Sequence, residues 1–385
     1  MPMKNIYLDH AATTPLDSRV LKAMTPYFTQ HFGNPSSVHS FGQNAAAGLE
    51  RARAIMAQYL HCQPSEVVFT SCGSESDNLA LRGAALTTRQ ERGANHLLIS
   101  PIEHPAILRT AQQLQDLFGF ELEFLPVDKY GRVTPAEVAK RIRPETAVVS
   151  VMYANNEVGT LNPIAKIGEI CREASVLFHT DAVQAVAHLP ANVQKLNVAL
   201  LSIGAHKFYG PKGVGALYVR DGTTLIPSQA GGAQEFGLRA GTENVPYLVG
   251  MAEAFRLVQI EHSQRSTASK KLRDRIIARV LEEIPHAKLT GHPSQRLPNH
   301  ASFALKNVDG NLLVAMLDAR GFACSSGSAC KTGNPKPSGV LTALGYSPEW
   351  TKGGLRVTVG KDTTSDDVEA FLDTLPDVVA LAREM

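Results

Sequence analysis

Between about residues 65 and 220, short apolar runs alternate with amphipathic stretches along the chain. The segment 105–119 is typical of the amphipathic kind, because its apolar side chains recur at helical spacing. The apolar runs are rich in valine, isoleucine and leucine, as in strands that are buried on both faces. This alternation predicts a mostly parallel sheet of seven strands with helices on both sides. The runs lie at 66–70, 96–100, 121–127, 147–153, 176–180, 199–203 and 215–219.

A helical pattern over residues 246–284 is longer than an ordinary helix and predicts a connection from this large domain into a smaller one. The chain of 385 residues also exceeds the usual size of a single hydrophobic core. The rest of the sequence indicates a small α+β domain. Its strands are expected near 301–306 and 355–359, and its helices near 309–320 and 365–382. We predict a large domain at 14–258 and a small domain formed by 1–13 and 259–385.

Composition and charge narrow the class of protein. The net charge is +2 and no long run of lysine or arginine occurs, which argues against nucleic acid or an anionic membrane as the main partner. The five cysteines are too few for a disulfide framework and favour a reducing compartment. No apolar run approaches the ~20 residues of a membrane helix, and residues 1–15 lack the apolar core of a signal peptide. A soluble, cytoplasmic enzyme is expected.

Small and polar residues gather directly after the predicted strands. In an open α/β sheet, ligands bind beyond the carboxyl ends of the strands, so a site is expected there. Each residue alone has an ordinary structural explanation, such as a serine that caps a helix or a lysine on the surface. Unrelated surface positions are not expected to bring an anion-binding turn, an imidazole, amides, a carboxylate and an amine to one crevice. The residues are Gly73, Ser74, His104, Asn155, Asp181, Gln184, His206 and Lys207.

One cofactor requires this combination of groups. Pyridoxal phosphate needs a lysine for a Schiff base, a cradle for its phosphate, and an acidic partner for its ring nitrogen. A Gly-Ser turn at a helix N-terminus binds phosphate. The Walker and GxGxxG motifs are missing, which disfavours ATP or NAD as the ligand. We assign Lys207 to the Schiff base, Gly73 and Ser74 to the phosphate, Asp181 to the ring nitrogen, His104 to stacking on the ring, and Asn155 and Gln184 to the ring hydroxyl.

Two cysteines, Cys324 and Cys330, lie six residues apart in the stretch CSSGSACKTG. A metal site, a disulfide and a nucleophilic thiol are the three interpretations of such a pair. No CxxC spacing occurs and no nearby cluster of histidine, cysteine or acidic residues completes a tetrahedral set, which disfavours a metal. For Cys324 two alternatives stay open: an inert packed thiol, which we favour, and a disulfide with Cys330 under oxidation.

Ten motifs in order along the chain resemble those of the pyridoxal-phosphate-dependent cysteine desulfurases of the NifS/IscS type, in the class-V aminotransferase family. Together these motifs are far more specific than any one of them. They are YLDHAATTP (7–15), GNPSSVHSFG (33–42), FTSCGSESDNLA (69–80), EHPAI (103–107), NNEVGT (155–160), HTDAVQ (179–184), HKFYGPKGVGALYVR (206–220), RAGTENV (239–245), SSGSAC (325–330) and LRVTVG (355–360).

The resemblance implies a transferase of fold type I that acts as a homodimer, with each active site at the subunit boundary. It implies that the enzyme converts L-cysteine to L-alanine and leaves the sulfur as a persulfide on Cys330, in a loop of the small domain. A sulfur-acceptor protein would then receive the sulfur for iron–sulfur cluster assembly, tRNA thiolation, DNA modification or another pathway. Lys331 and the small residues around Cys330 suit a reactive, accessible thiolate.

The resemblance also assigns further residues to the cofactor and substrate. It implies that Lys207 carries the Cα proton, that His104 acts as an acid or base, and that His206 contacts the phosphate. Thr242 would reach the phosphate from the partner subunit. Arg356, assisted by Asn155, would bind the substrate carboxylate, a role that suits the fork of a guanidinium group.

Three positions depart from the family pattern. Gly204 replaces a serine whose hydroxyl contacts phosphate, Phe236 replaces a basic residue, and Cys72 replaces a glycine in the phosphate turn. We expect Cys72 to be inert. The alternative functions are a selenocysteine lyase or an aminotransferase on the same fold, and a catalytically silent scaffold, which the intact set of site residues disfavours.

Overall fold

The seven apolar runs form one sheet in the computed structural model, which describes residues 5–326 and 337–384. Its strands are β2 (Val67–Thr70), β3 (His96–Ile99), β4 (Glu121–Phe124), β5 (Thr146–Ser150), β6 (Leu177–Asp181), β7 (Leu200–Gly204) and β8 (Gly215–Val219). Their order is β2-β8-β7-β6-β5-β3-β4, and only β8 runs antiparallel to its neighbours β2 and β7. The predicted mostly parallel sheet of seven strands is therefore confirmed.

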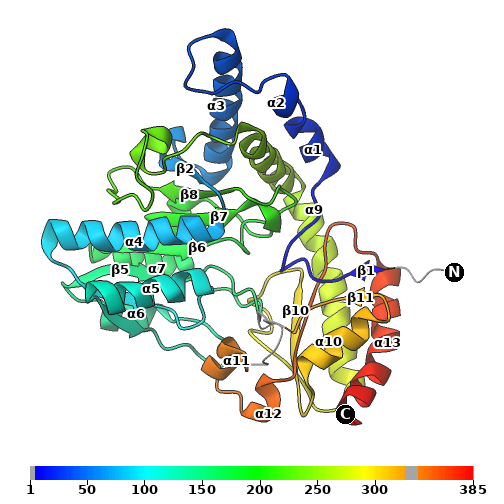
Figure 1. Ribbon diagram of the computed structural model, residues 1–385. Coiled ribbons are helices and arrows are strands. Elements are labelled where there is room, and N and C mark those ends of the chain that lie inside the picture. The colour runs from blue at the N-terminus through cyan, green and yellow to red at the C-terminus, as the bar shows by residue number, and fades with distance from the viewer. Residues whose placement is uncertain (1–4, 327–336, 385) are drawn as a thin grey trace.

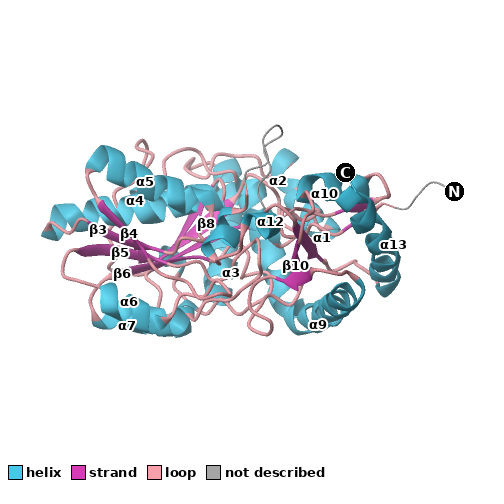
Figure 2. Ribbon diagram, turned by 90° about the horizontal axis from the view of Figure 1, so that it is seen from below, coloured by secondary structure: helices cyan, strands magenta, loops and turns pink. Residues whose placement is uncertain are grey.

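Helices cover both faces of this sheet (Figure 2). On one face lie α4 (Gly73–Arg92) and α5 (Pro105–Phe118), and on the other α6 (Pro135–Arg141) and α7 (Ile164–Glu173). Successive strand side chains point to opposite faces, and the two neighbouring valines of β2 accordingly belong to two separate hydrophobic cores. Because both faces are buried, most positions of the inner strands are apolar, whereas the edge strand β4 carries Glu121 and Glu123 and is partly exposed.

The smaller part of the molecule has its own core and two short sheets. The central strand β10 (His300–Leu305) pairs antiparallel with β9 (Ala287–Leu289) and β12 (Gly354–Thr358). A second pair joins β1 (Ile6–Tyr7) in parallel to β11 (Phe322–Ala323). Helices α10 (Gly310–Asp318) and α13 (Ser365–Glu384) contribute to the same core.

The helix α9 (Val245–Glu283) connects the two parts as a single element of 39 residues (Figure 1). Leu248 and Val258, in its first half, belong to the core of the large sheet, whereas Ile276 and Val280 belong to the small core. The predicted boundary after residue 258 therefore falls inside a helix that both parts share. The division into 14–258 and the remainder stays our proposal.

The N-terminal segment, residues 8–14, crosses from the small part to the large one (Figure 1). Leu8 extends the pairing of β1 with β11, since its N–H donates to the carbonyl of Ala323. At the other end, the N–H of Thr14 donates to the carbonyl of His206, 2.9 Å away, directly beyond β7. The segment therefore runs along the junction between the two parts.

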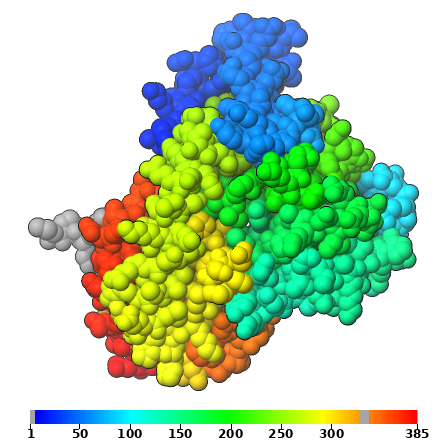
Figure 3. Space-filling model, turned by 180° about the vertical axis from the view of Figure 1, so that it is seen from behind, coloured from blue at the N-terminus to red at the C-terminus, as the bar shows by residue number. Residues whose placement is uncertain are grey.

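The helices α1 (Ser18–Met24), α2 (Pro26–Thr29) and α3 (Ser40–Leu60) project from the end of the molecule opposite the small part (Figures 1 and 3). In the described part of the chain, no helix is long and apolar enough to cross a bilayer, and no group of three metal-ligating side chains converges. The remaining short helices are α8 (Val193–Leu196), α11 (Gly339–Ala343), α12 (Pro348–Thr351) and the 3-10 turns at Pro64–Glu66, Ala205–Lys207 and Gln234–Gly237.

Candidate active site

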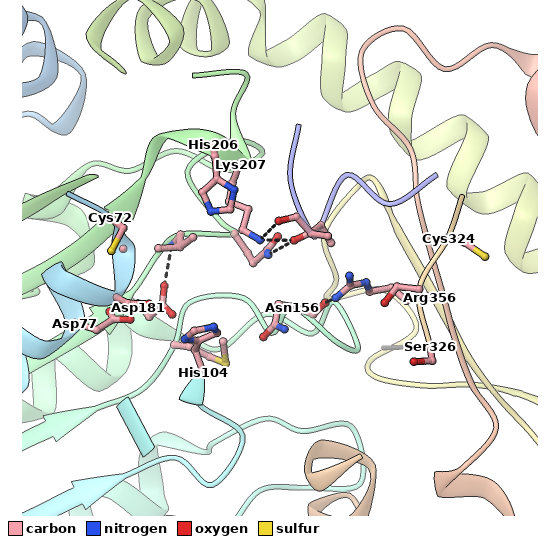
Figure 4. Close-up of a pocket in the computed structure, with 18 of the residues that line it drawn as sticks. Cys72, Asp77, His104, Asn156, Asp181, His206, Lys207, Cys324, Ser326 and Arg356 are labelled. Carbon is pink, nitrogen blue, oxygen red and sulfur yellow. Dashed lines mark hydrogen bonds between the residues drawn. The ribbon is translucent and has the colours of Figure 1, made fainter. Parts of the chain in front are cut away.

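A cavity of about 490 Å³ opens where the N-terminal segment, the carboxyl ends of the large sheet and the small sheet meet (Figure 4). Loops and helix starts that follow β2, β3, β6 and β7 supply one wall, and β12 supplies the opposite one. Eight of the predicted site residues line this cavity, although they come from positions spread over most of the chain. They are Gly73, Ser74, His104, Asp181, Gln184, His206, Lys207 and Arg356.

The turn from β2 into α4 forms a cradle at the helix N-terminus. Cys72 caps α4: its Sγ accepts a hydrogen bond from the N–H of Glu75 at 3.4 Å. The helix begins at Gly73, where an added Cβ would lie 2.7 Å from a methyl group of Val183, so the close packing of this turn requires glycine. The amides and the dipole of a 20-residue helix therefore face the cavity and favour an anion there.

Gly204, at the end of β7, lies beside this cradle. A Cβ added there would be 3.4 Å from the amide nitrogen of Gly73, an ordinary contact, and the φ of −131° suits any residue. We expect Gly204→Ser to place a hydroxyl at the phosphate site and to lower the dissociation constant of pyridoxal phosphate about tenfold, as for one hydrogen bond to a charged group. Fluorescence titration of the apoenzyme measures this, and Gly204→Ala is the matched control. An equal gain with alanine would contradict the hydroxyl explanation.

Lys207 reaches the cavity from the turn that follows β7. Its Nζ donates hydrogen bonds to the carbonyl oxygens of Ala11 and Ala12, at 2.5 and 2.7 Å. Burial, together with the positive charge of Arg356, lowers the pKa of Lys207 to about 8 against the opposing effect of Asp181. A larger share of this amine is therefore neutral near pH 7 than for an ordinary lysine, and the neutral amine is the nucleophilic form.

The two histidines of the cavity are held by hydrogen bonds to their Nδ1 atoms. His104 caps α5, and its Nδ1 accepts from the N–H of Ala106 at 3.1 Å, which leaves the proton on Nε2. Nδ1 of His206 lies 3.1 Å from Oγ1 of Thr13 in the N-terminal segment. Burial lowers the pKa of both rings, that of His206 to about 4, so both are neutral near pH 7. A neutral imidazole stacks on an aromatic ring without adding charge.

Asp181 is the last residue of β6 and points into the cavity (Figure 4). One of its oxygens accepts a hydrogen bond from the N–H of Val183 at 2.8 Å. Burial raises the pKa of its carboxyl, while His104 and Lys207 act in the opposite direction. A carboxyl of raised basicity suits a partner for a pyridine nitrogen. Gln184, one turn further on, donates to the carbonyl of Ala11 at 2.8 Å.

Arg356 lies on β12 and faces the cavity from the small part (Figure 4). Its Nη2 donates to a carboxylate oxygen of Asp9 at 2.8 Å, and its Nη1 donates to the carbonyl of Asn156 at 2.9 Å. Among the described residues, its buried Nε has no hydrogen-bond partner. The two contacts fix the plane of the guanidinium group, whose positive charge at the cavity wall suits a substrate carboxylate.

We expect Arg356→Gln to raise KM for the amino-acid substrate about 100-fold and to change kcat much less, because the lost charge-assisted bonds hold the substrate before and during reaction. Steady-state kinetics measure both constants. Arg275→Gln is the matched control, since Arg275 pairs with Glu369 on an exposed surface and does not line the cavity. A variant with a normal KM would contradict the assignment of Arg356 to substrate binding.

Two predicted residues lie away from this cavity. The carboxamide of Asn155 is buried and bonds to backbone groups: it donates to the carbonyl of Ile102 and accepts from the N–H groups of Glu157 and Val158, each at 2.9 Å. Its neighbour Asn156 lines the cavity instead. Contact of Asn155 with the cofactor or the substrate stays a prediction. Thr242 is exposed and lines a different hollow. Cys330 lies outside the described residues.

The remaining departures, Cys72 and Phe236, and the second cysteine of interest, Cys324, can also be located. Cys72 and Cys324 both line the cavity. Cys324 is 8% exposed, and burial raises the pKa of its thiol to about 12, which keeps it protonated and unreactive near pH 7. Phe236 is largely exposed, and its ring lies 5.0 Å from the guanidinium carbon of Arg53.

Four groups in the cavity or next to it were not predicted. Asp9 pairs with Arg356, and the carbonyls of Ala11 and Ala12 bind Lys207. Asp77, in the second turn of α4, is almost fully buried against the cavity. A signal for Asp77 exists in the sequence, because helical spacing places it on the same face as the buried Ala80 and Ala84.

Comparisons with known proteins agree with this geometry. The family model for class-V aminotransferases matches residues 6–371. The cysteine desulfurase IscS of Methanosarcina thermophila is 45% identical over 382 residues, which cover 99% of this chain and 94% of the relative. A solved NifS-like protein is 35% identical with a TM-score of 0.91, covering 98% of this chain and all of the other. SspA, solved in complex with cysteine, is 34% identical with a TM-score of 0.81 over 93% of this chain and 99% of the other.

The chain therefore belongs to the class-V aminotransferase family and has the α/β fold of its NifS-like members. Its cofactor is pyridoxal 5'-phosphate. The tight turn at Gly73 and the amine of Lys207 fit this cofactor, since they would suit its phosphate and its aldehyde. Within the family, the chain groups with the cysteine desulfurases of the IscS and NifS type, as its motifs predict.

Proposed function

We propose that this enzyme is a cysteine desulfurase that converts L-cysteine to L-alanine and passes the sulfur to an acceptor protein through a persulfide on Cys330. The observation that carries the proposal is the cavity itself. It brings a lysine of lowered pKa, a buried carboxyl and a fixed guanidinium group to one space. Ser326, which also lines this space, precedes Cys330 by four positions in the sequence. The complex of the related SspA with cysteine supports the choice of substrate.

Each step of the proposed reaction uses a group of this chain. Arg356 holds the substrate carboxylate, and the neutral amine of Lys207 takes the Cα proton. Bound pyridoxal phosphate supplies an electron-accepting ring that stabilises the charge left at Cα. The thiolate of Cys330 attacks the substrate sulfur, so that an S–S bond forms and the C–S bond breaks. The electron pair stays with carbon, which takes up a proton to give alanine. Cysteine and enzyme thiol thus yield alanine and enzyme persulfide.

The test is the stoichiometry of alanine and sulfur released from L-cysteine by the holoenzyme. We expect one alanine for each sulfur, recovered as persulfide without reductant and as sulfide with it. The same assay with selenocysteine, or with a keto acid and an amino donor, distinguishes the alternatives. Efficient transamination without persulfide would identify an aminotransferase. Turnover of selenocysteine alone would identify a selenocysteine lyase.

The proposal includes a homodimer. Phe28, Phe32, Val38 and Phe41 are each half or more exposed on α2, α3 and their connection, and these elements project from the body of the molecule (Figure 3). Exposed aromatic clusters of this kind mark protein interfaces. Thr242 is exposed as well, which suits a role at the partner's phosphate site.

We expect sedimentation analysis to give twice the 41.5 kDa of one chain, and Phe32→Asp to shift the protein toward the monomer with weaker cofactor binding. A monomeric wild-type enzyme with full activity would contradict the shared site.

We further propose a cytoplasmic location, because the few cysteines favour a reducing compartment. The proposed acceptor is a protein rather than a nucleic acid or a membrane.

A further inference from the structure

Asp77 is a second carboxyl group at the end of the cavity where Asp181 lies (Figure 4). It belongs to α4, one turn beyond the phosphate cradle, and only 1% of it is exposed. One of its carboxyl oxygens has no hydrogen-bond partner among the described residues. Because the favourable field of a helix N-terminus falls off within the first turn, α4 gives a charge on Asp77 little support.

Within the described part of the chain, no cation neutralises Asp77. The nearest candidate is His179, whose Nε2 lies 3.7 Å from an Asp77 oxygen. Both ring nitrogens of His179 already have hydroxyl partners, the Oγ atoms of Ser150 and Ser202, each at 2.9 Å. Burial lowers the pKa of His179 to about 3, so the ring is neutral near pH 7. A buried carboxylate without a counter-charge retains its proton instead.

The other neighbours of Asp77 act in the same direction. Burial raises the pKa of Asp77 well above its usual value, and the carboxyls of Asp181 and Glu103 and the thiol of Cys72 add to this, against a hydrogen bond from Ser202. Burial also raises the pKa of Asp181, but Asp181 has a different environment, since the amide of Val183 and the amine of Lys207 favour its charged form. The two environments therefore separate the two carboxyls into an acid and a base.

We propose that Asp77 is a positioning residue that holds the proton of a carboxyl pair, so that Asp181 alone presents a negative charge to the ring nitrogen of the cofactor. The inference rests on the proposed role of Asp181. It has a consequence that a packing role lacks. When Asp181 becomes a neutral asparagine, the like charge disappears, and Asp77 can release its proton and replace the lost carboxylate in part.

The experiment is a double-mutant cycle with Asp77→Asn, Asp181→Asn and the double variant. Its readouts are the dissociation constant of pyridoxal phosphate and the absorption spectrum of the bound cofactor as a function of pH. We expect Asp77→Asn to weaken cofactor binding about threefold or less in the wild-type background and at least about tenfold in the Asp181→Asn background, a coupling within the range for residues in contact. Circular dichroism establishes that each variant is folded.

Infrared difference spectroscopy gives a second, direct measurement. At neutral pH the wild-type enzyme should show the carbonyl band of a protonated buried carboxyl that Asp77→Asn lacks. Glu103→Gln is the matched control, because Glu103 is also buried with a raised pKa but its Oε1 accepts from the N–H of Met152 at 2.6 Å. Its removal should abolish a separate band and leave the coupling in place.

Two outcomes would overturn the inference. Equal effects of Asp77→Asn in both backgrounds, or a band unaffected by this variant, would overturn it alone. Normal cofactor affinity and spectrum in Asp181→Asn would overturn the assignment of Asp181 and the inference with it. Neither readout measures the turnover of cysteine, so failure of the desulfurase proposal would be seen separately.

Discussion

Lys207→Ala is expected to lower turnover of L-cysteine by at least ~1,000-fold, because the variant loses both the Schiff-base amine and the group that moves the Cα proton. No other described lysine lines the cavity, so no second amine takes over. The variant should still bind pyridoxal phosphate through the cradle at Gly73, but borohydride reduction should no longer attach the cofactor to the chain. Mass spectrometry of the reduced protein and an alanine assay measure the two effects.

The control for this variant is Lys212→Ala, in the same loop. Lys212 is exposed and does not line the cavity, so its loss should leave both the attachment and the turnover near wild-type values. The lowered pKa of Lys207 adds a dependence on pH: attachment of the cofactor should speed up as the pH rises toward about 8 and level off above it. A Lys207→Ala enzyme that remains active would contradict the assignment of Lys207 to the Schiff base and to transfer of the Cα proton.

Cys330→Ser is expected to abolish persulfide formation and to reduce sulfur release by at least ~100-fold, because a serine hydroxyl is not ionised near neutral pH and is a poor nucleophile toward sulfur. The early steps should survive, since they use Lys207 and Arg356. Cysteine should therefore still change the absorption of the bound cofactor. Rapid-mixing absorption and mass spectrometry of the cysteine-treated protein separate these two effects.

Cys324→Ser provides the matched comparison six residues away. Its thiol lines the same cavity, but burial keeps it protonated, so its loss should alter sulfur transfer only through packing. Comparable loss of persulfide in both variants would indicate that the two thiols act together. Full activity of Cys330→Ser would assign the nucleophile elsewhere.

Much of the large domain could be predicted because the burial of its strands is visible in the sequence as apolar runs. The neighbouring side chains Val148 and Val149 of β5 belong to two separate cores, and burial of both gives a continuous apolar run. The antiparallel direction of β8 leaves no such trace, since its run is equally buried in either direction. The small β1–β11 pair was missed for another reason: strands of two residues are too short for any periodicity.

In the candidate site, too, some residues could be predicted from a pattern in the sequence and others could not. His104, Asp181 and Lys207 could be placed together because each follows a strand of one sheet, and parallel strands end at a common edge. Asp9 could not, because its partner Arg356 belongs to a different sheet and no local pattern links them. That Asn156 lines the cavity could not be predicted either, since adjacent amides in a turn differ only in the backbone angles that direct their side chains.

The N-terminal segment also determines when the site is completed during synthesis. The hydrogen bond between Asp9 and Arg356 joins residues 347 positions apart in the sequence, and that between Ala11 and Lys207 joins residues 196 positions apart. Contacts this distant form late and slowly, because long loops must close before they are made. A ribosome-bound chain that has already formed the large sheet still lacks β12. It therefore lacks Arg356, which binds Asp9 of the N-terminal segment. We therefore expect a nascent chain to remain inactive until almost the whole protein has emerged.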